Sequence, residues 1–287
     1  MQCKLCGCQV ERPRYRLEGF TVLACPGCGL VFTDLEPTRD ELRRTYGLRY
    51  FLERREYYFQ NVVADPTNGR EDGQIADFKQ WLDWLKSLKG KGRLLDVGCG
   101  IGIFLTMAQE RGWEAYGVDI SEGAVEIAKS RSGVKAVAGT LTEARFPDRF
   151  FDVITLLDVF EHFPNPLIEL MEIGRILKED GLIFLNTPNQ KALLRRLAHA
   201  LHRLSFGRWT YPVRKVFHQY HLYYYSLETL RATLQKRGFA IVQWEAKPIP
   251  VVKARGSRIE KAIVQAVSTL ERFLHMEYEL VVVARRA

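Results

Sequence analysis

The sequence predicts an α/β protein with a doubly wound, seven-stranded and mostly parallel sheet, preceded by a small cysteine-rich module. Two observations lead to this prediction. From residue 93 onward, short apolar runs alternate with segments of helical periodicity, the pattern of parallel strands joined by right-handed helical crossovers. Before that, five of the six cysteines fall within the first 28 residues, and four of them form two Cys-x-x-Cys pairs. A chain of 287 residues has room for one large and one small domain.

Each predicted element follows from the local pattern. Apolar residues recur at helical spacing from Ile75 to Leu88, and Gly90-Lys-Gly92 ends that helix. Strands are predicted at residues 93–97, 114–118, 136–138, 151–156, 182–186, 240–245 and 280–284. Further helices are predicted at about 102–111, 121–131, 166–177, 226–237 and 258–274. In the first 35 residues, short β-like runs cover residues 14–17, 20–24 and 30–33.

The chain divides into three parts. Residues 1–37 form the cysteine-rich module, 38–72 an aromatic-rich helical connector, and 73–287 the α/β domain. The connector ends near a cluster of turn formers at Asp65–Gly69. Residues 188–222 are predicted to be an insertion that follows the fifth strand of the sheet.

Composition excludes several classes of protein. An apolar fraction of 47% supports an ordinary globular core and excludes wholesale disorder. No run approaches the roughly 18 uninterrupted apolar residues of a membrane span. The chain opens without a basic and then apolar leader, so we do not expect a secreted, disulfide-linked protein. The expectation is a cytoplasmic globular protein.

The net charge of +8 is concentrated in one segment. Residues 186–227 contain seven lysines and arginines and no aspartate or glutamate, together with four of the six histidines. A patch of one sign predicts an anionic partner, such as a phosphate, a nucleotide sugar, a nucleic acid or a lipid head group.

A glycine-rich turn follows the first predicted strand of the α/β domain. Residues 94–105 read as a strand, a tight turn and a helix start, and the turn contains Gly98, Gly100 and Gly102. Glycines allow the backbone to approach a ligand closely, and a helix N-terminus adds exposed N–H groups. About 20 residues further on, Asp119 closes the second strand, where doubly wound folds bind a ribose diol. The turn and the acid together predict a nucleoside site.

Asp96 decides which nucleoside is favoured. It stands two residues before the first glycine, where its charge would repel a pyrophosphate but could accept hydrogen bonds from an amino group. This arrangement resembles the motif of class I methyltransferases that use S-adenosylmethionine (SAM), and residues 150–166 and 181–189 resemble the fourth and fifth strands of that superfamily. The resemblance implies that SAM is the cofactor. It implies that Gly98, Gly100 and Gly102 contact the methionine and ribose of SAM, and that Asp119 binds the ribose hydroxyls. It also implies that Ile120 contacts the adenine, that Thr140 and Leu141 lie at the adenine edge, and that Leu157 and Asp158 lie at the methionine end.

The two cysteine pairs predict one structural zinc ion per chain. They are Cys3-x-x-Cys6 and Cys25-x-x-Cys28, separated by 18 residues, and a glycine follows each pair. Four thiolates in this spacing form a closed tetrahedral zinc site, and a module under about 40 residues rarely folds on apolar burial alone. Cys8 is an alternative to Cys6 as a ligand.

The cysteine module and connector are similar to those of bacterial methyltransferases that have an N-terminal zinc ribbon. The similarity includes residues 25–34, Tyr46, Tyr50-Phe51, residues 207–209 and 221–226. That group is associated with modification of sugars and cell-envelope glycans. The resemblance implies an acceptor hydroxyl on a sugar, a nucleotide sugar or a lipid-linked glycan, with the insertion 188–222 as a lid over it.

Methyl transfer to a hydroxyl requires removal of a proton, and histidine is the natural base at neutral pH. Glu161-His162 follows the fourth strand and His221 precedes a late helix, so we expect His162 or His221 to be the base and Glu161 to assist it. Alternatively, Asp158, Glu161 and His162 bind a divalent metal. This run is similar to the Glu-x-x-Glu-His run of ubiquinone-pathway O-methyltransferases.

Residues 191–204 predict a basic amphipathic helix. Leucines fall on one stripe, and Arg195, Arg196, His199 and Arg203 fall opposite. Three roles are open for such a helix. It is expected to be a lid over the acceptor, or to anchor residues 190–204 on anionic lipid at the inner membrane surface, or to pack its apolar face on the core with its polar face in solvent.

Three other functions remain open on the sequence. Zinc ribbon and basic charge also occur in ribosomal RNA methyltransferases, but residues 1–75 carry no net charge, so nucleic acid is not the expected partner. The second is a phenol O-methyltransferase of the ubiquinone type. The third is a non-catalytic scaffold with a SAM fold, whose ribbon docks a partner.

Overall fold

The computed structural model describes residues 1–51, 73–131, 133–248 and 258–287. Its centre is a seven-stranded sheet in the order β10-β11-β8-β7-β4-β5-β6. The strands are β4 (Arg93–Val97), β5 (Glu114–Asp119), β6 (Lys135–Ala138), β7 (Phe151–Leu157), β8 (Leu177–Pro188), β10 (Phe239–Lys247) and β11 (Glu279–Arg286). Strands β6, β5, β4, β7 and β8 pair in parallel, whereas β11 is antiparallel to both of its neighbours. The predicted doubly wound, mostly parallel fold is confirmed.

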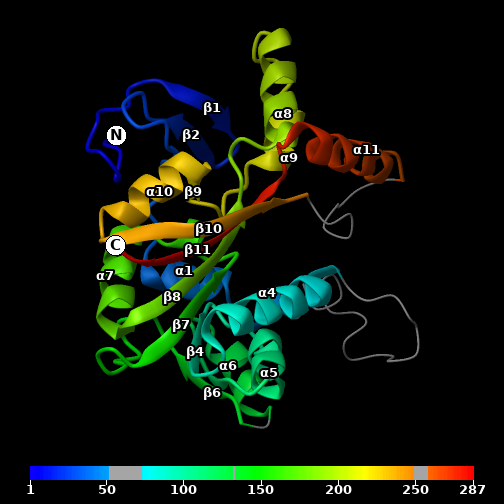
Figure 1. The fold of residues 1–287 in the computed structure, drawn as a ribbon. Helices are drawn as coiled ribbons and strands as arrows, with labels where there is room; N and C mark the ends of the chain where they lie inside the picture. The colour runs from blue at the N-terminus through cyan, green and yellow to red at the C-terminus, as the bar shows by residue number, and fades with distance from the viewer. Residues whose placement is uncertain (52–72, 132, 249–257) are drawn as a thin grey trace.

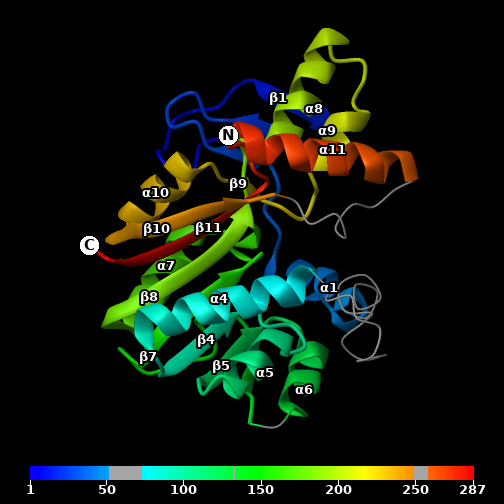
Figure 2. The ribbon, with the colours of Figure 1, turned by 45° about the vertical axis from the view of Figure 1, so that its right-hand side comes forward.

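Helices cover both faces of this sheet (Figures 1 and 2). The helices α4 (Gly73–Lys89), α5 (Ile103–Glu110) and α6 (Glu122–Lys129) share one apolar core with sheet residues such as Leu94. The helices α7 (Pro166–Ile176) and α10 (Leu227–Gln235) share the other core with the next residue, Leu95. Successive strand residues point to opposite faces, so continuous apolar strands are buried on both sides.

Three helices begin at the carboxyl edge of the sheet. Gly102 precedes α5 with a φ of +78°, a left-handed conformation that favours glycine. Ser121 caps α6 by accepting the N–H of Ala124, and Asn165 caps α7 by accepting the N–H of Ile168. These starts place the loops after β4, β5 and β7 next to one another.

The cysteine-rich module is joined to the domain through a second sheet. Its strands β1 (Pro13–Leu17), β2 (Phe20–Ala24) and β3 (Val31–Thr33) pair in that order, and β9 (Tyr223–Tyr224) adds to β3. In that pairing Phe32 lies opposite Tyr223, and the N–H of Thr33 donates to the carbonyl of Leu222 at 2.9 Å. Phe32 also belongs to the same apolar core as α7 and α10. The module is therefore packed against the insertion and the domain.

The basic helix α8 (Leu193–Leu204) is core-facing only at the start of its leucine stripe, where Leu193 is buried. With α9 (Tyr211–Val216) it forms a hairpin that projects from the body of the molecule (Figures 1 and 2). Arg195 is buried at 2% exposure, whereas Leu197, Leu201 and Leu204 are exposed. The Arg195 guanidinium donates to the carbonyl of Val216 at 2.5 Å and lies over aromatic rings of Phe217, Tyr224 and Tyr278.

Of the connector, residues 39–45 form helix α1 (Arg39–Thr45), as the pattern predicts. The predicted boundary at Asp65–Gly69 lies outside the described residues. Helix α11 (Arg258–Leu274) lies beside the start of α8 (Figure 2). Among the helices described, none is long and apolar enough to cross a membrane.

Candidate active site

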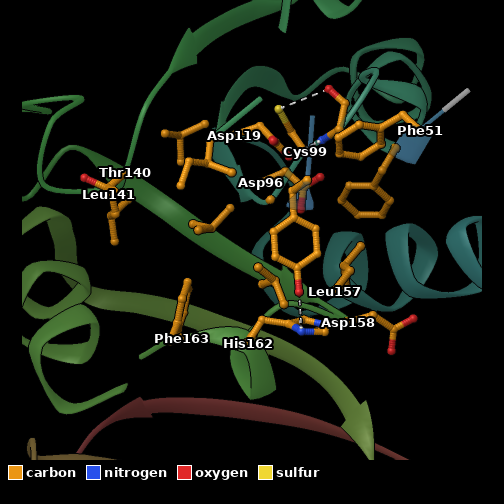
Figure 3. A pocket seen from close by; sticks show the side chains of 18 of the residues that line it. Phe51, Asp96, Cys99, Asp119, Thr140, Leu141, Leu157, Asp158, His162 and Phe163 are labelled. Atoms are coloured by element: carbon orange, nitrogen blue, oxygen red, sulfur yellow. Dashed lines mark hydrogen bonds between the residues drawn. The ribbon is translucent and has the colours of Figure 1, made fainter. Parts of the chain in front are cut away.

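A pocket of about 290 Å³ opens at the carboxyl ends of β4, β5 and β7. The loops that follow these strands form one side, and the segment from α1 to Phe51 forms another. In Figure 3, Asp96 and Asp119 lie together, with Asp158 and His162 across from them. This is the edge at which open α/β sheets bind ligands.

Two buried carboxylates line the pocket. Asp119 accepts the N–H of Gly100 and the N–H of Ser121, both at 2.8 Å. Burial raises the pKa of Asp119 to about 6, although these two hydrogen bonds lower it. Burial also raises the pKa of Asp96 to about 7. The hydrogen bond from the Thr155 hydroxyl at 2.6 Å lowers the pKa of Asp96, and the charge of Asp119 raises it.

No positive side chain of the described residues compensates these acids. Neither Asp96 nor Asp119 forms a salt bridge within the described ranges, and the described lining contains no lysine or arginine. Besides Asp158, the lining contains Glu169 from the first turn of α7, and burial raises the pKa of Glu169 to about 7, with repulsion from Glu172. Buried carboxylates without a cationic partner are costly, so the pocket favours a positively charged ligand.

The glycine turn provides room at the pocket floor. Gly98 has a φ of +77°, and a Cβ there would lie 2.8 Å from the Val159 side chain. Gly100 has a φ of +51°, and a Cβ would lie 2.8 Å from the ring of Phe51. Both positions therefore require glycine. Gly102 is not among the lining residues, because it packs against Ala128 at the start of α5.

The other residues predicted to contact the cofactor line the pocket. The pocket lining includes Asp96, Gly98, Gly100, Asp119, Ile120, Thr140, Leu141, Leu157 and Asp158. Cys99 is buried beside the two acids, and burial, followed by the charges of Asp119 and Asp96, raises its pKa well above the usual range. A thiol in this state is not a nucleophile at neutral pH.

His162 is the predicted base that lines the pocket. Its Nδ1 lies 2.6 Å from the carbonyl oxygen of Tyr220 and 2.9 Å from the hydroxyl of Tyr46 (dashed line at His162 in Figure 3). A carbonyl only accepts, so Nδ1 carries the proton and the lone pair of a neutral ring is on Nε2. The backbone of residue 220 thus fixes the tautomer.

Glu161 and His221 lie behind His162 and are not part of the pocket lining. Glu161 is 1% exposed and accepts the Thr187 hydroxyl at 2.9 Å. One carboxylate oxygen of Glu161 is 4.0 Å from Nε2 of His162, and the rings of His162 and His221 are centred 4.7 Å apart. Ligand atoms of Glu161, His162 and His221 lie within 4.8 Å of one another, a group that could hold a metal. His221, rather than the expected Asp158, completes that group.

The connector also contributes to the pocket, which its sequence pattern did not predict. Tyr46, Tyr50 and Phe51 line the pocket, and an ion pair between Arg39 and Glu143 at 2.5 Å fastens α1 to the loop after β6. Glu143 also accepts the N–H of Thr140 at 2.8 Å, so one carboxylate links α1 to the pocket rim. The aromatic richness of residues 46–51 was the available signal.

The four predicted zinc ligands converge. The Sγ atoms of Cys3 and Cys28 are 3.6 Å apart, those of Cys6 and Cys25 are 3.4 Å apart, and all four lie within 4.8 Å of one another. Zn–S bonds of about 2.3 Å place the sulfurs of a tetrahedral site about 3.8 Å apart. The cluster is compatible with a structural zinc ion. Cys8 is not part of the group, and its thiol donates to the carbonyl of the next residue.

The fold and the pocket define an α/β protein with a nucleoside-type site at the carboxyl edge of its sheet. The chain belongs to the family of methyltransferase domains, whose sequence model matches residues 69–244. The methyltransferase fold supports SAM binding.

Relatives and solved structures agree with this family. The ubiquinone biosynthesis O-methyltransferase of Pseudomonas aeruginosa is 33% identical over 144 residues, which are 47% of this chain and 62% of that protein. The match therefore spans less than two thirds of that relative. A SAM-dependent methyltransferase from Archaeoglobus fulgidus superposes with a TM-score of 0.55 at 21% identity, covering 83% of this chain and 99% of the other. Magnesium protoporphyrin IX methyltransferase from Synechocystis PCC 6803, with bound SAH, gives 0.57 at 17% identity, covering 87% and 100%. These structures are similar in fold.

Proposed function

We propose that this methyltransferase transfers the methyl group of SAM to a hydroxyl, with His162 as the general base. The observation that carries the proposal is the position of His162 in the pocket, where Tyr220 leaves its Nε2 as the basic nitrogen. When bound, SAM supplies a methyl group activated on a sulfonium. The residues of the chain bind and orient it, exclude water and remove the proton of the acceptor.

The two unpaired acids suit this cofactor. SAM carries positive charge on its amino group and on its sulfur, which would compensate Asp96 and Asp119. In the proposed arrangement Asp119 holds the ribose hydroxyls, Asp96 accepts from the amino group, and Ile120, Thr140 and Leu141 enclose the adenine. Leu157 and Asp158 lie toward the methionine end, and His162 stands beyond them.

For the acceptor we propose a hydroxyl of a sugar, a nucleotide sugar or a lipid-linked glycan. A second hollow of about 470 Å³ lies between the β1–β2 turn and the segment that follows α9. Its lining combines aromatic rings with hydrogen-bonding groups, as carbohydrates require. It consists of Leu17, Glu18, Gly19, Phe20, Arg214, Phe217, His218, Gln219 and Tyr220. Tyr220 belongs to this hollow and also bonds His162 through its carbonyl, which supports an acceptor path between the two.

The test measures methyl transfer from labelled SAM to a panel of nucleotide sugars and methyl glycosides. We expect transfer to a sugar hydroxyl, a loss of about 10²–10⁴-fold in kcat for His162→Ala, and SAH affinity within about twofold of the wild type. The exposed His275→Asn is the matched control and should retain full activity. Equal kcat for His162→Ala and the wild type would refute the role of His162.

A phenol is the second candidate acceptor, because relatives 33% identical over part of the chain are named ubiquinone biosynthesis O-methyltransferases. The apolar rings of Tyr46, Tyr50 and Phe51 around the pocket would suit an aromatic acceptor. In that case Glu161, His162 and His221 would be the candidate ligands of a divalent metal. Transfer to a catechol in the same panel, with no transfer to any sugar, would select this function over the first.

A further inference from the structure

The hairpin of α8 and α9 has a surface that the proposed reaction does not use. We name residues 197–215, the outer part of this hairpin, the hairpin tip. In both views α8 stands away from the body of the molecule, and α9 returns beside it (Figures 1 and 2). A projecting element can reach a flat surface that the rest of the molecule does not contact.

Large apolar side chains are concentrated at the hairpin tip. Leu204 is 77% exposed and Phe206 is 91% exposed. Phe206 sits in the turn at a φ of +53°, an unusual conformation for an aromatic residue. The other exposed apolar residues of the tip are Leu197, Leu201, Trp209 and Tyr211. A soluble surface seldom gathers so many large apolar residues unless they meet a partner.

The inner side of the hairpin explains why the leucines face outward. Ala198 packs with Val22 and Val31 of the cysteine-rich module, and Arg195 is enclosed by aromatic rings. Tyr15 of β1 donates or accepts a hydrogen bond with Nδ1 of His199 at 2.7 Å. The module therefore fixes which face of α8 is buried, and Leu197, Leu201 and Leu204 are left exposed.

Positive charges surround the apolar residues of the tip. Arg203 and Arg208 are exposed and form no ion pair in the described part of the chain. Residues 186–227 contain no acid at all, and within the described residues the lysines and arginines of this segment form two ion pairs, Arg214 with Glu18 and Lys191 with Glu228. The tip thus combines an apolar centre with two arginines, Arg203 and Arg208, that form no ion pair among the described residues.

This combination matches an anionic bilayer surface. Aromatic and leucine side chains enter the boundary between head groups and acyl chains, while arginines remain at the level of the anionic head groups. A nucleic acid would use the cations but would leave the leucines in water. We propose that the hairpin tip docks this protein on anionic membrane lipid. The proposal does not depend on the acceptor, because docking requires neither SAM nor catalysis.

The experiment is co-sedimentation with vesicles, without SAM. One set contains phosphatidylcholine alone, and the other contains phosphatidylcholine with phosphatidylglycerol. The wild type should bind the second set and not the first, and the binding should weaken as salt increases. Leu204→Ser/Phe206→Ser and Arg203→Glu/Arg208→Glu should each bind at least about tenfold more weakly.

Two control variants are matched in chemistry and lie elsewhere. Ile168→Ser/Met171→Ser removes two exposed apolar residues of α7, and Arg231→Glu/Lys236→Glu makes the same charge change on α10 and at the residue that follows it. Both should bind the anionic vesicles like the wild type, with melting temperatures measured for all variants. Tryptophan fluorescence is a second readout. The emission of Trp209, identified as the part of the wild-type spectrum that is absent in Trp209→Phe, should shift to shorter wavelength when anionic vesicles are added to the wild type.

Three results would overturn the proposal. The first is a wild type that does not bind phosphatidylglycerol vesicles. The second is a Leu204→Ser/Phe206→Ser variant that binds them undiminished. The third is single-stranded RNA binding that depends on Arg203 and Arg208 while vesicles are not bound, which would assign the tip to nucleic acid.

Discussion

Asp96 and Asp119 are the residues on which the cofactor site depends. Each carboxylate is buried and has only hydrogen-bond donors from the chain as partners within the described ranges, two backbone N–H groups for Asp119 and a hydroxyl for Asp96. Such a pair opposes folding unless it is protonated or meets a positive ligand. Functional sites commonly contain groups that the free protein holds in an unfavourable state.

The raised pKa values predict a pH dependence with a definite sign. Below about pH 4, the pKa range of carboxyls in an unfolded chain, the protonated forms of these two acids stabilise the free protein. This stabilisation is lost as the pH rises through their folded pKa values of about 6 for Asp119 and about 7 for Asp96. SAM requires the ionised acids, so its affinity should fall more than about tenfold between pH 7.5 and pH 5.5.

Calorimetry with SAH across this range tests the sign. Asp96→Asn, which cannot ionise, should bind with a smaller pH dependence than the wild type. Affinity that rises toward low pH, or an unchanged dependence in Asp96→Asn, would exclude the assigned role of the acids.

Tyr46 is a positioning residue in this account, because its hydroxyl contacts His162 rather than the cofactor. Tyr46→Phe should lower kcat about three- to tenfold and shift the pH–rate profile, since the hydrogen bond that the Tyr46 hydroxyl accepts from Nδ1–H contributes roughly 1 kcal/mol. SAH affinity should not change. The control is Tyr211→Phe on the hairpin, which removes a hydroxyl away from His162. If the Tyr46→Phe enzyme had the wild-type pH–rate profile, Tyr46 would have a packing role alone.

At the scale of elements, the cysteine-rich module positions the segment that reaches His162. Strand β3 pairs with β9, and the N–H of Leu222 donates to the carbonyl of Glu161 at 2.9 Å. Lys4 of the module also donates to the carbonyl of Pro164 at 3.3 Å. The module therefore contacts both segments that carry the candidate catalytic histidines.

Removal of zinc should weaken the contacts between the cysteine-rich module and the segments that carry His162 and His221. After chelation, or in Cys25→Ser, we expect less than one zinc per chain, a lower melting temperature and faster amide hydrogen exchange over residues 218–224. Exchange in α5 and α6 should change less, because they pack on the opposite face of the sheet. A metal-free protein with unchanged melting and exchange would show that the four cysteines do not bind a structural metal.

The elements of the α/β domain could be predicted because their patterns are local. Parallel strands buried on both faces are continuous apolar runs, and the glycine turn and Asp119 adjoin strand ends. The buried face of α8 could not be predicted in this way. Periodicity identifies its leucine stripe, but the surface that covers the helix comes from β2 and β3, more than 160 residues earlier. The partners of His162 were missed for the same reason, since Tyr46 is 116 residues away.

At the scale of the whole molecule, the cysteine-rich module and the domain share one apolar core. Phe32, from β3, is 2% exposed and belongs to the core that contains Leu230 of α10 and Ile173 of α7. A shared core couples the unfolding of the parts that build it. The module is thus an integral part of the fold as described.

Phe32→Ala tests this coupling. The substitution should lower the free energy of unfolding by about 3–5 kcal/mol, the range for a buried phenylalanine. Urea unfolding followed by far-UV circular dichroism and by tryptophan fluorescence should give one coincident transition. Val137→Ala, at an exposed position of β6, should have little effect. Two separated transitions in the wild type would show that the module unfolds by itself.

The most direct measurement is a crystal structure of the protein with S-adenosylhomocysteine. We expect the ligand to occupy the pocket at the carboxyl ends of β4, β5 and β7, with its ribose hydroxyls on Asp119, its amino group toward Asp96 and its sulfur facing the side that carries His162. A ligand bound elsewhere, or a pocket that stays empty at saturating concentration, would contradict it.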